Sequence, residues 1–135
     1  MRLIVDTSVI ISALIKDSLA RRILLQLEAE LLTIHFSARE IENHKREIIE
    51  VAGISNAEFD HILEKLMNFL ITLDDQVVRE RMVEAHKIMD HIDSFDTPCI
   101  SAALAVNADI WSNDKHFEKQ NKIKVWKTKD LEPFL

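Results

Sequence analysis

The sequence predicts an α/β protein of one domain, residues 1–135, in which a central parallel sheet of four to five strands is flanked by helices. Three observations carry this prediction. Short apolar runs alternate with longer helical patterns, which is the order of elements found in parallel sheets. Asp6 directly follows the first short run, and Asp114 lies two residues after the run 109–112. The chain is also long enough to bury one core without disulfides or a structural metal.

The composition is typical of a soluble globular protein, with 47% hydrophobic and 30% charged residues. A net charge of −6 argues against a protein that coats nucleic acid by charge alone, although it allows local basic patches. The single cysteine, Cys99, has no disulfide partner in the chain, so we expect inert packing in a reducing compartment. No signal-peptide pattern and no apolar run of membrane length is present, so we expect a cytoplasmic protein.

The first part of the chain predicts two strands and two helices. Residues 2–5 form an apolar run typical of a buried parallel strand, and Asp6 follows at once. Thr7 or Ser8 is expected to cap a helix that continues to Ile15. The other elements of this part are a helix over residues 18–30 and a strand over residues 31–35.

The middle of the chain predicts a pair of helices joined at Gly53. A helix is expected from Ser37 to this glycine, because glycine commonly ends helices. Ser55 and Glu58 have the spacing of a capping box, which restarts the helix toward Leu70. The two helices are therefore expected to form an antiparallel hairpin. A strand over residues 69–73 and a helix over residues 75–89 follow.

Residues 93–114 combine the carboxylates of Asp93, Asp96 and Asp114 with a buried helix. Thr97 is predicted to cap this helix and Pro98 to occupy its first position, so Asp96 lies just before it. Asn107 is predicted to end the helix in the left-handed conformation. The last elements are a strand over residues 109–112, a helical turn over 115–119, a strand over 123–127 and a terminal turn capped by Thr128.

Four carboxylates are predicted to meet at one edge of the sheet. Asp6 and Asp114 follow strands, and Asp96 precedes a helix. Glu40 lies in the first turn of the helix after the second strand. The carboxyl ends of parallel strands are where such sheets place their sites. Four carboxylates there would repel one another, and a divalent cation would offset the repulsion.

Oxygen ligands of this kind suit Mg²⁺ or Mn²⁺, which keep several waters and leave coordination sites open to a phosphate. Such an ion lowers the pKa of a bound water and stabilises charge on the scissile phosphate. The chemistry indicated is metal-dependent hydrolysis of a phosphodiester bond.

These residues resemble the motifs of the PIN-domain ribonucleases over nearly the whole chain. Asp6 is similar to the family's first metal-site acid, with Ser8 as the small polar residue that supports it. Glu40 matches the family's glutamate. Asp96, ahead of an alanine-rich helix, matches the third acid, and Asp114 matches the fourth. The resemblance implies a PIN-like domain with catalysis by these four acids and metal binding by the three aspartates.

The resemblance also implies an endonuclease that cleaves single-stranded RNA and depends on Mg²⁺ or Mn²⁺. Members are often homodimers, and the apolar faces of the helical hairpin favour a dimer here. Members are also often the toxin of a toxin–antitoxin pair, as in VapC-like proteins, so an antitoxin protein is a further expected partner. Residues 37–70 are longer than in the small toxins and resemble stand-alone archaeal and bacterial PIN proteins. Both alternatives, toxin and stand-alone nuclease, stay open.

Several of the site residues have alternative interpretations. Glu42 and Glu47 compete with Glu40 for the position of the second acid. Asp93 is either an auxiliary acid or a surface residue, and Ser112 either orients the acid after it or forms the turn. The fourth acid itself can be read as a turn aspartate. The third can be read as a carboxylate that only stabilises a helix N-terminus.

Basic residues near the predicted site are candidates for contacts with RNA. Lys115 and His116 are predicted to be candidates for binding substrate. The six histidines show no paired ligand spacing, so the others are interpreted as structural or surface residues. Six cations would serve RNA phosphates if they rim the site and otherwise form a solvated face. They are Arg21, Arg22, Lys45, Arg46, Lys115 and Lys119.

Two other functions are weighed against the nuclease. A non-catalytic PIN-like module that binds RNA or protein would lack or misplace an acid, and all four positions are filled. A phosphatase with Asp6 as nucleophile would need a second acid two residues later, where the chain has Ser8. The sequence therefore favours the ribonuclease.

Overall fold

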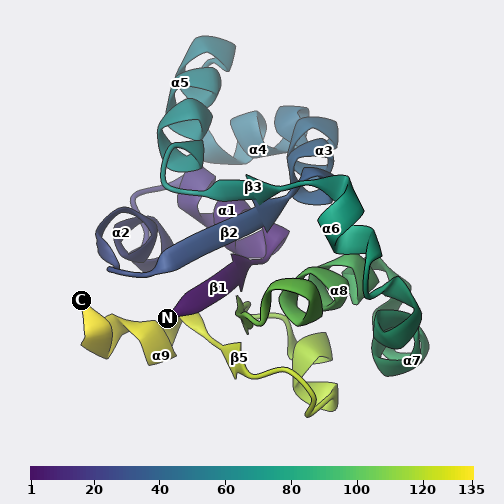
Figure 1. Ribbon diagram of the computed structural model, residues 1–135. Coiled ribbons are helices and arrows are strands. Elements are labelled where there is room, and N and C mark those ends of the chain that lie inside the picture. The colour runs from purple at the N-terminus through teal and green to yellow at the C-terminus, as the bar shows by residue number, and fades with distance from the viewer.

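The computed structural model describes all residues 1–135 and contains one parallel sheet of five strands (Figure 1). The strand order is β3-β2-β1-β4-β5, and every neighbouring pair is parallel. The strands are β1 (Arg2–Val5), β2 (Glu30–Ile34), β3 (Ile71–Leu73), β4 (Asp109–Trp111) and β5 (Val125–Trp126). The predicted α/β class with a central parallel sheet is confirmed.

The strand order places a topological switch point beside β1. The chain moves from β1 outward to β2 and β3, then returns to pair β4 on the other side of β1. Connections from β1 and β4 therefore leave the carboxyl edge in opposite directions, which opens a crevice between them in sheets of this type. Asp6 directly follows β1 at this point.

Nine α-helices and three short 3₁₀ helices connect the strands and follow the last one. The longest α-helices have 12 residues, and none of the helices is long and apolar enough to cross a membrane. The α-helices are α1 (Thr7–Ile15), α2 (Leu19–Gln26), α3 (His35–Asn43), α4 (Lys45–Ala52), α5 (Asn56–Met67), α6 (Asp75–Arg79), α7 (Met82–Asp93), α8 (Thr97–Val106) and α9 (Thr128–Leu131). The 3₁₀ helices are η1 (Ser94–Asp96), η2 (Lys115–Lys119) and η3 (Glu132–Phe134).

Both faces of the sheet are buried, which explains why its central strands are continuous apolar runs. In β1, Leu3 and Val5 pack in a cluster with residues of α1, α2, α4 and α5. Ile4 between them faces the opposite cluster, with residues of α6, α7 and α8. Leu31 and Leu32 of β2 divide between the two clusters in the same way. The helices therefore form a layer on each side of the sheet (Figure 1).

Helix α8 is buried nearly all round, as its small apolar residues predict. Ala102 and Ala103 have no exposed surface, and α8 packs closely against α7. The buried hydroxyl of Ser101 donates a hydrogen bond to the backbone carbonyl of Val78, which fixes α6 on α8. Cys99 is a buried free thiol, and burial raises its pKa well above the usual value. A thiol in this state packs and does not react.

Two predicted helices are each broken into two. The helix predicted over 37–53 is α3 and α4, separated at His44, whose φ of −101° and ψ of 9° leave the helical region. The helix predicted over 75–89 is α6 and α7, separated at Glu80 and Arg81. Each break lets both halves pack on one partner, α1 for the first pair and α8 for the second. Neither break is marked by glycine or proline, so the helical pattern alone did not reveal it.

Three predicted caps are wrong, because tertiary partners take the hydroxyls. Asp6 and Asp96, not Thr7 and Thr97, occupy the cap positions of α1 and α8. Thr97 Oγ1 instead donates to Asp90 Oδ1 on α7 at 2.8 Å. Thr128 is the first residue of α9, and its hydroxyl accepts a hydrogen bond from the Trp111 indole. Predicted helix 18–30 also ends early, at Gln26, because the chain must extend to enter β2.

Both predicted left-handed residues are confirmed. Gly53 has a φ of 67° after α4, and Asn107 has a φ of 54° after α8. The capping box of Ser55 and Glu58 is present in both directions at the start of α5. Helices α4 and α5 both pack on α1, and Lys45 of α4 makes an ion pair with Asp60 of α5. The turn at Gly53 therefore packs both helices against α1.

Gly53→Ala should destabilise the protein through its backbone alone. A Cβ added at Gly53 would meet no atom within 4 Å, so no steric clash contributes. The left-handed conformation costs a residue with a Cβ about 1 kcal/mol, and we expect this loss in the free energy of unfolding by urea. Gly53→Asn should lose less, because asparagine tolerates this conformation better. Equal losses for both variants would contradict a backbone origin.

Candidate metal centre

Asp6 is held at the carboxyl end of β1 by two hydroxyl groups. Its Oδ2 accepts hydrogen bonds from Ser8 Oγ at 2.7 Å and from Ser112 Oγ at 2.8 Å. Its backbone N–H continues the sheet by donating to the carbonyl of Trp111 in β4. The carboxylate is only partly exposed, and burial raises its pKa, with a further rise from Asp114. The backbone of β1 and both serines thus fix its position.

Asp114 lies beside Asp6 because β4 pairs with β1. Ser112 follows β4, is buried, and accepts a hydrogen bond from the Asp114 N–H at 3.0 Å. The same hydroxyl donates to Asp6, so one serine links the two acids. Asp114 Oδ1 accepts the backbone N–H of His116 at 2.9 Å, which starts the turn of η2. The Ser112 hydroxyl therefore orients both acids.

Asp96 is brought to the same edge by η1 and the start of α8. The Thr97 hydrogen bond to Asp90 fixes this end of α8 against α7. Asp93 Oδ1 accepts the N–H of Phe95 at 3.0 Å, which fixes the backbone just before Asp96. The Asp96 side chain is 15% exposed, and its Oδ2 is buried without a hydrogen-bond partner. A buried carboxylate oxygen with no partner is costly unless something binds it.

Glu40 reaches the edge from α3. Thr7 Oγ1 lies 2.9 Å from Glu40 Oε1 and 2.7 Å from the hydroxyl of Ser37. The Thr7 hydroxyl has one proton, and we assign this proton to the hydrogen bond with the Glu40 carboxylate. The Ser37 hydroxyl then donates to Thr7 Oγ1. Glu42 is exposed on another side of α3, in a groove with Lys45. The structure therefore places Glu40, and not Glu42, toward the other acids.

The electrostatics show that the acids converge. Burial, followed by the charges of Asp6, Asp93, Asp114 and Glu40 in that order, raises the pKa of Asp96 to about 7. A carboxylate whose pKa is raised by four neighbouring acids lies within their common field. The convergence predicted from strand ends and a helix start is thus present in the fold.

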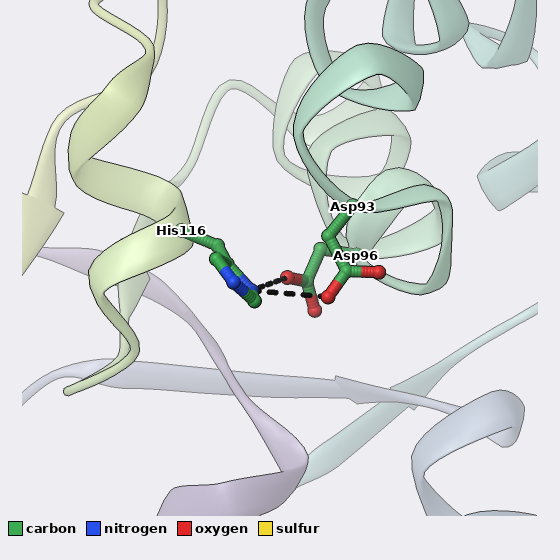
Figure 2. A group of neighbouring side chains, drawn as sticks. All are labelled: Asp93, Asp96 and His116. Carbon is green, nitrogen blue, oxygen red and sulfur yellow. Dashed lines mark ion pairs between the residues drawn. The ribbon is translucent and has the colours of Figure 1, made fainter.

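The imidazole of His116, predicted only as a substrate contact, lies among these acids. Its Nδ1 is 3.0 Å from Asp93 Oδ2, 3.4 Å from Asp114 Oδ1 and 3.8 Å from Asp96 Oδ2. Figure 2 shows the imidazole projecting from η2 toward Asp93 at the end of α7 and Asp96 in η1. The Nδ1 atom is buried and lacks hydrogen-bond geometry to any of them, although the distances are those of ion pairs. One ligand atom each from Asp93, Asp96 and His116 lies within 4.8 Å of the others.

A family model described as the PIN domain matches residues 4–134, which is almost the entire chain. The chain belongs to the PIN-domain family. The crystal structure of VapBC2 from Rickettsia felis bound to a DNA fragment from their promoter contains a chain of the same fold, with a TM-score of 0.72. The match covers 94% of this chain and 98% of that chain at 15% sequence identity. No curated protein sequence matches this PIN domain.

The donor set of this PIN domain fits a divalent cation. Carboxylate oxygens dominate it, which is the preference of Mg²⁺ and Mn²⁺, and an imidazole nitrogen suits Mn²⁺ as well. The Oδ2 atom of Asp96 is buried without a hydrogen-bond partner, and the charges of the other acids raise the pKa of this carboxyl. Only His116 brings a group that can carry positive charge to the cluster. The site therefore has the charge and the free ligand atom that a metal ion requires.

The remaining predicted residues lie at the rim. Ser8 is exposed and binds Asp6, so it supports the acid from the solvent side. Lys115 is exposed at the start of η2 and makes no ion pair. Asp93 is partly buried between Phe95 N–H and His116 and is not a free surface residue. Thr7 was predicted only as a cap, and its hydroxyl bond to Glu40 depends on a tertiary contact across 33 residues.

Asp96→Asn should make the metal-free protein more stable at neutral pH. The pKa of Asp96 is about 7 in the folded state, above its ordinary 3.8, so the unfolded chain releases this proton at a lower pH than the folded chain does. Ionisation of Asp96 therefore lowers the free energy of unfolding. This loss is absent below pH 3.8, grows as the pH rises, and is complete above about pH 7. We expect urea denaturation in EDTA to show a gain of about 1–2 kcal/mol at pH 8 and little change at pH 4.

Glu42→Gln is the matched control for this measurement, because Glu42 is an exposed acid on α3 that points away from the cluster. It should change the free energy of unfolding by less than about 0.5 kcal/mol at either pH. A pH-independent effect of Asp96→Asn, or an equal effect of both variants, would contradict repulsion within the cluster.

Proposed function

We propose that this PIN domain is a metal-dependent endoribonuclease that hydrolyses phosphodiester bonds of single-stranded RNA. The observation that carries the proposal is the convergence of four carboxylates at one edge, where burial and mutual repulsion raise the pKa of Asp96 to about 7. Such repulsion is tolerated where a bound ligand offsets it, which is characteristic of functional sites. Membership of the PIN-domain family supports the same function.

Asp6, Asp96 and Asp114 are the proposed ligands of Mg²⁺ or Mn²⁺, with Glu40 as the fourth catalytic acid. A bound divalent ion would stabilise charge on the scissile phosphate and favour ionisation of an attacking water. Asp93 and His116 lie close enough to Asp96 to complete the ligand set or to position it.

The chain's own hydroxyl groups would hold the acids in place for this chemistry. Ser112 donates to Asp6 and accepts the N–H of Asp114, so a single buried hydroxyl sets the separation of two acids. Ser8 donates to the same oxygen of Asp6, which leaves the carboxylate little rotation. A threonine hydroxyl of α1 holds Glu40. Fixed ligands of this kind reduce the reorganisation that the reaction would otherwise require.

Lys115 and His116 are proposed to contact the RNA backbone. Lys115 is an exposed ammonium group without an ion pair, and it directly follows the fourth acid in the chain. A lysine beside an acidic metal site attracts the phosphate and does not compete for the ion. His116 is partly exposed, so its ring can serve the substrate as well as the acids.

The biological role that fits best is the toxin of a toxin–antitoxin pair. The similar chain comes from a VapBC2 complex, and the match covers 94% of this chain and 98% of that chain. We accordingly propose an antitoxin protein as a partner, and a cytoplasmic location where RNA is present and Cys99 stays reduced.

Purified protein should cleave a mixed-sequence, fluorescently labelled single-stranded RNA with Mn²⁺ or Mg²⁺ and should not cleave it in EDTA. Asp96→Asn should lower the cleavage rate by at least about 100-fold, because it removes a proposed metal ligand from a preorganised site. Glu42→Gln changes the net charge equally and should cleave at the normal rate. Gel analysis of the labelled products measures all three proteins.

Cleavage by Asp96→Asn at the wild-type rate would show that the assigned acids are wrong. If the folded wild-type protein neither cleaves RNA nor binds Mn²⁺ by calorimetry, the chain is a non-catalytic PIN-like module that binds RNA or a protein. Mn²⁺ binding without cleavage would point to a substrate of specific sequence or structure.

The homodimer remains a prediction, and exposed apolar residues of the helical hairpin and its neighbouring strand offer places to test it. Exposed apolar side chains lie at the end of α4, after α5 and at the edge strand β3, namely Val51, Phe69 and Ile71, which are 71%, 49% and 55% exposed. Small-angle scattering should give the mass of two chains. Phe69→Glu should shift the mass toward one chain, because a charge at an apolar interface is costly. A monomer mass for the unchanged protein would exclude the dimer.

A further inference from the structure

A groove opens beside the acid cluster, between α3, α6 and the start of α8. We call it the α3–α6 groove. Its apolar surface comes from the end of β2, the second residue of α3 and the second residue of α8, namely Ile34, Phe36 and Pro98, with Met82 from α7. Its polar side chains are Arg39, Arg79 and Asp75. It thus combines a hydrophobic floor with two guanidinium groups and one carboxylate.

The α3–α6 groove continues the same edge of the sheet that carries the acids. Arg39 directly precedes Glu40 on α3, and Pro98 follows Asp96 by two residues. The wall made by α6 is fixed, because the Ser101 hydroxyl of α8 binds the Val78 carbonyl of α6. A strand of nucleic acid with one phosphate at the acids can therefore place a neighbouring nucleotide in this groove.

The two arginines are available to bind an anion. Arg39 and Arg79 are both exposed, and neither makes an ion pair or a side-chain hydrogen bond within the protein. Asp75 is the only acid in the lining, and it pairs with neither arginine. The chain as a whole carries a net charge of −6, and the acid cluster repels phosphate. RNA therefore needs cations beside the cluster, and guanidinium groups bind phosphate with directed hydrogen bonds.

The floor of the groove suits a nucleobase. Phe36 and Met82 are partly exposed beside buried Ile34, so an apolar surface including one aromatic ring faces the groove. Unpaired bases of single-stranded RNA stack on aromatic and apolar side chains, whereas bases in a duplex are covered by their neighbours. The carboxylate of Asp75 can accept a hydrogen bond from a base amino group. These features select a single strand over a duplex.

We propose that the α3–α6 groove binds one nucleotide of single-stranded RNA next to the scissile phosphodiester. The base packs on Phe36, Met82 and Pro98, and Arg39 and Arg79 bind the flanking phosphates. This inference rests on the proposed ribonuclease function and adds the position and chemistry of a substrate subsite to it.

The test measures binding of a 5′-fluorescein-labelled, mixed-sequence single-stranded RNA by fluorescence anisotropy, in EDTA so that no cleavage occurs. The double variant Arg39→Gln/Arg79→Gln should weaken binding at least about tenfold. The slope of log Kd against log salt should fall by about 0.7 for each phosphate that the variant no longer neutralises. Phe36→Leu should weaken binding roughly fivefold without changing this slope, because stacking carries no counterion release. In cleavage assays, the arginine variants should raise KM more than they lower kcat.

Arg22→Gln is the matched control. Arg22 was a candidate for phosphate contact only if it rimmed the site, but it is an exposed, unpaired arginine on α2, which packs on the face of the sheet opposite to α6. It should bind and cleave RNA as the unchanged protein does. If the double arginine variant behaves like this control while metal-dependent cleavage persists, the groove is not the subsite and the ribonuclease function still holds. If the unchanged protein neither binds nor cleaves single-stranded RNA, the proposed function itself fails.

Discussion

Mutual repulsion among four carboxylates is the constraint that the rest of the fold must satisfy. The acids come from β1, α3, the start of α8 and the end of β4, so four separate segments must meet against that repulsion. Backbone pairing of β1 with β4 supplies one fixed distance, because Asp6 N–H continues the ladder to the Trp111 carbonyl. Hydroxyl donors fix the positions of the other acids, since hydrogen bonds to charged groups stabilise by about 1.5–3 kcal/mol each. Buried apolar clusters on both faces of the sheet then hold these segments together.

The fold class followed from the sequence because its signals are local. Apolar runs buried on both faces, the capping box at Ser55 and the left-handed residues Gly53 and Asn107 all act within a few positions. The helix breaks at His44 and Arg81 did not follow, because they arise where two segments must turn to pack on a common partner. No glycine or proline marks either break, so the cause lies in tertiary packing and not in local propensity.

The candidate site was predictable to the extent that strand ends and helix starts fix it. The positions of Asp6 and Asp114 follow from the sheet, whereas choosing Glu40 over Glu42 requires knowing which face of α3 meets Thr7. His116 was predicted only as a substrate contact. Its approach to the acids depends on the tight turn of η2, which begins with the Asp114 carboxylate. An Asn-Asp turn with a histidine two residues later was the available signal, but such turns are common in ordinary loops.

The repulsion that destabilises the folded state is also the source of binding energy for a cation. A ligand that binds only the folded state stabilises it in proportion to the logarithm of its concentration over its Kd, so an ion that relieves the repulsion returns folding free energy. Natural proteins accept such destabilised sites where function requires them. In the proposed ribonuclease the same field would repel the phosphates of RNA, so a cation at the acids would not suffice to hold a strand. Unpaired arginines such as Arg39 and Arg79 would attract the polyanion without neutralising the acids, because they lie outside the cluster.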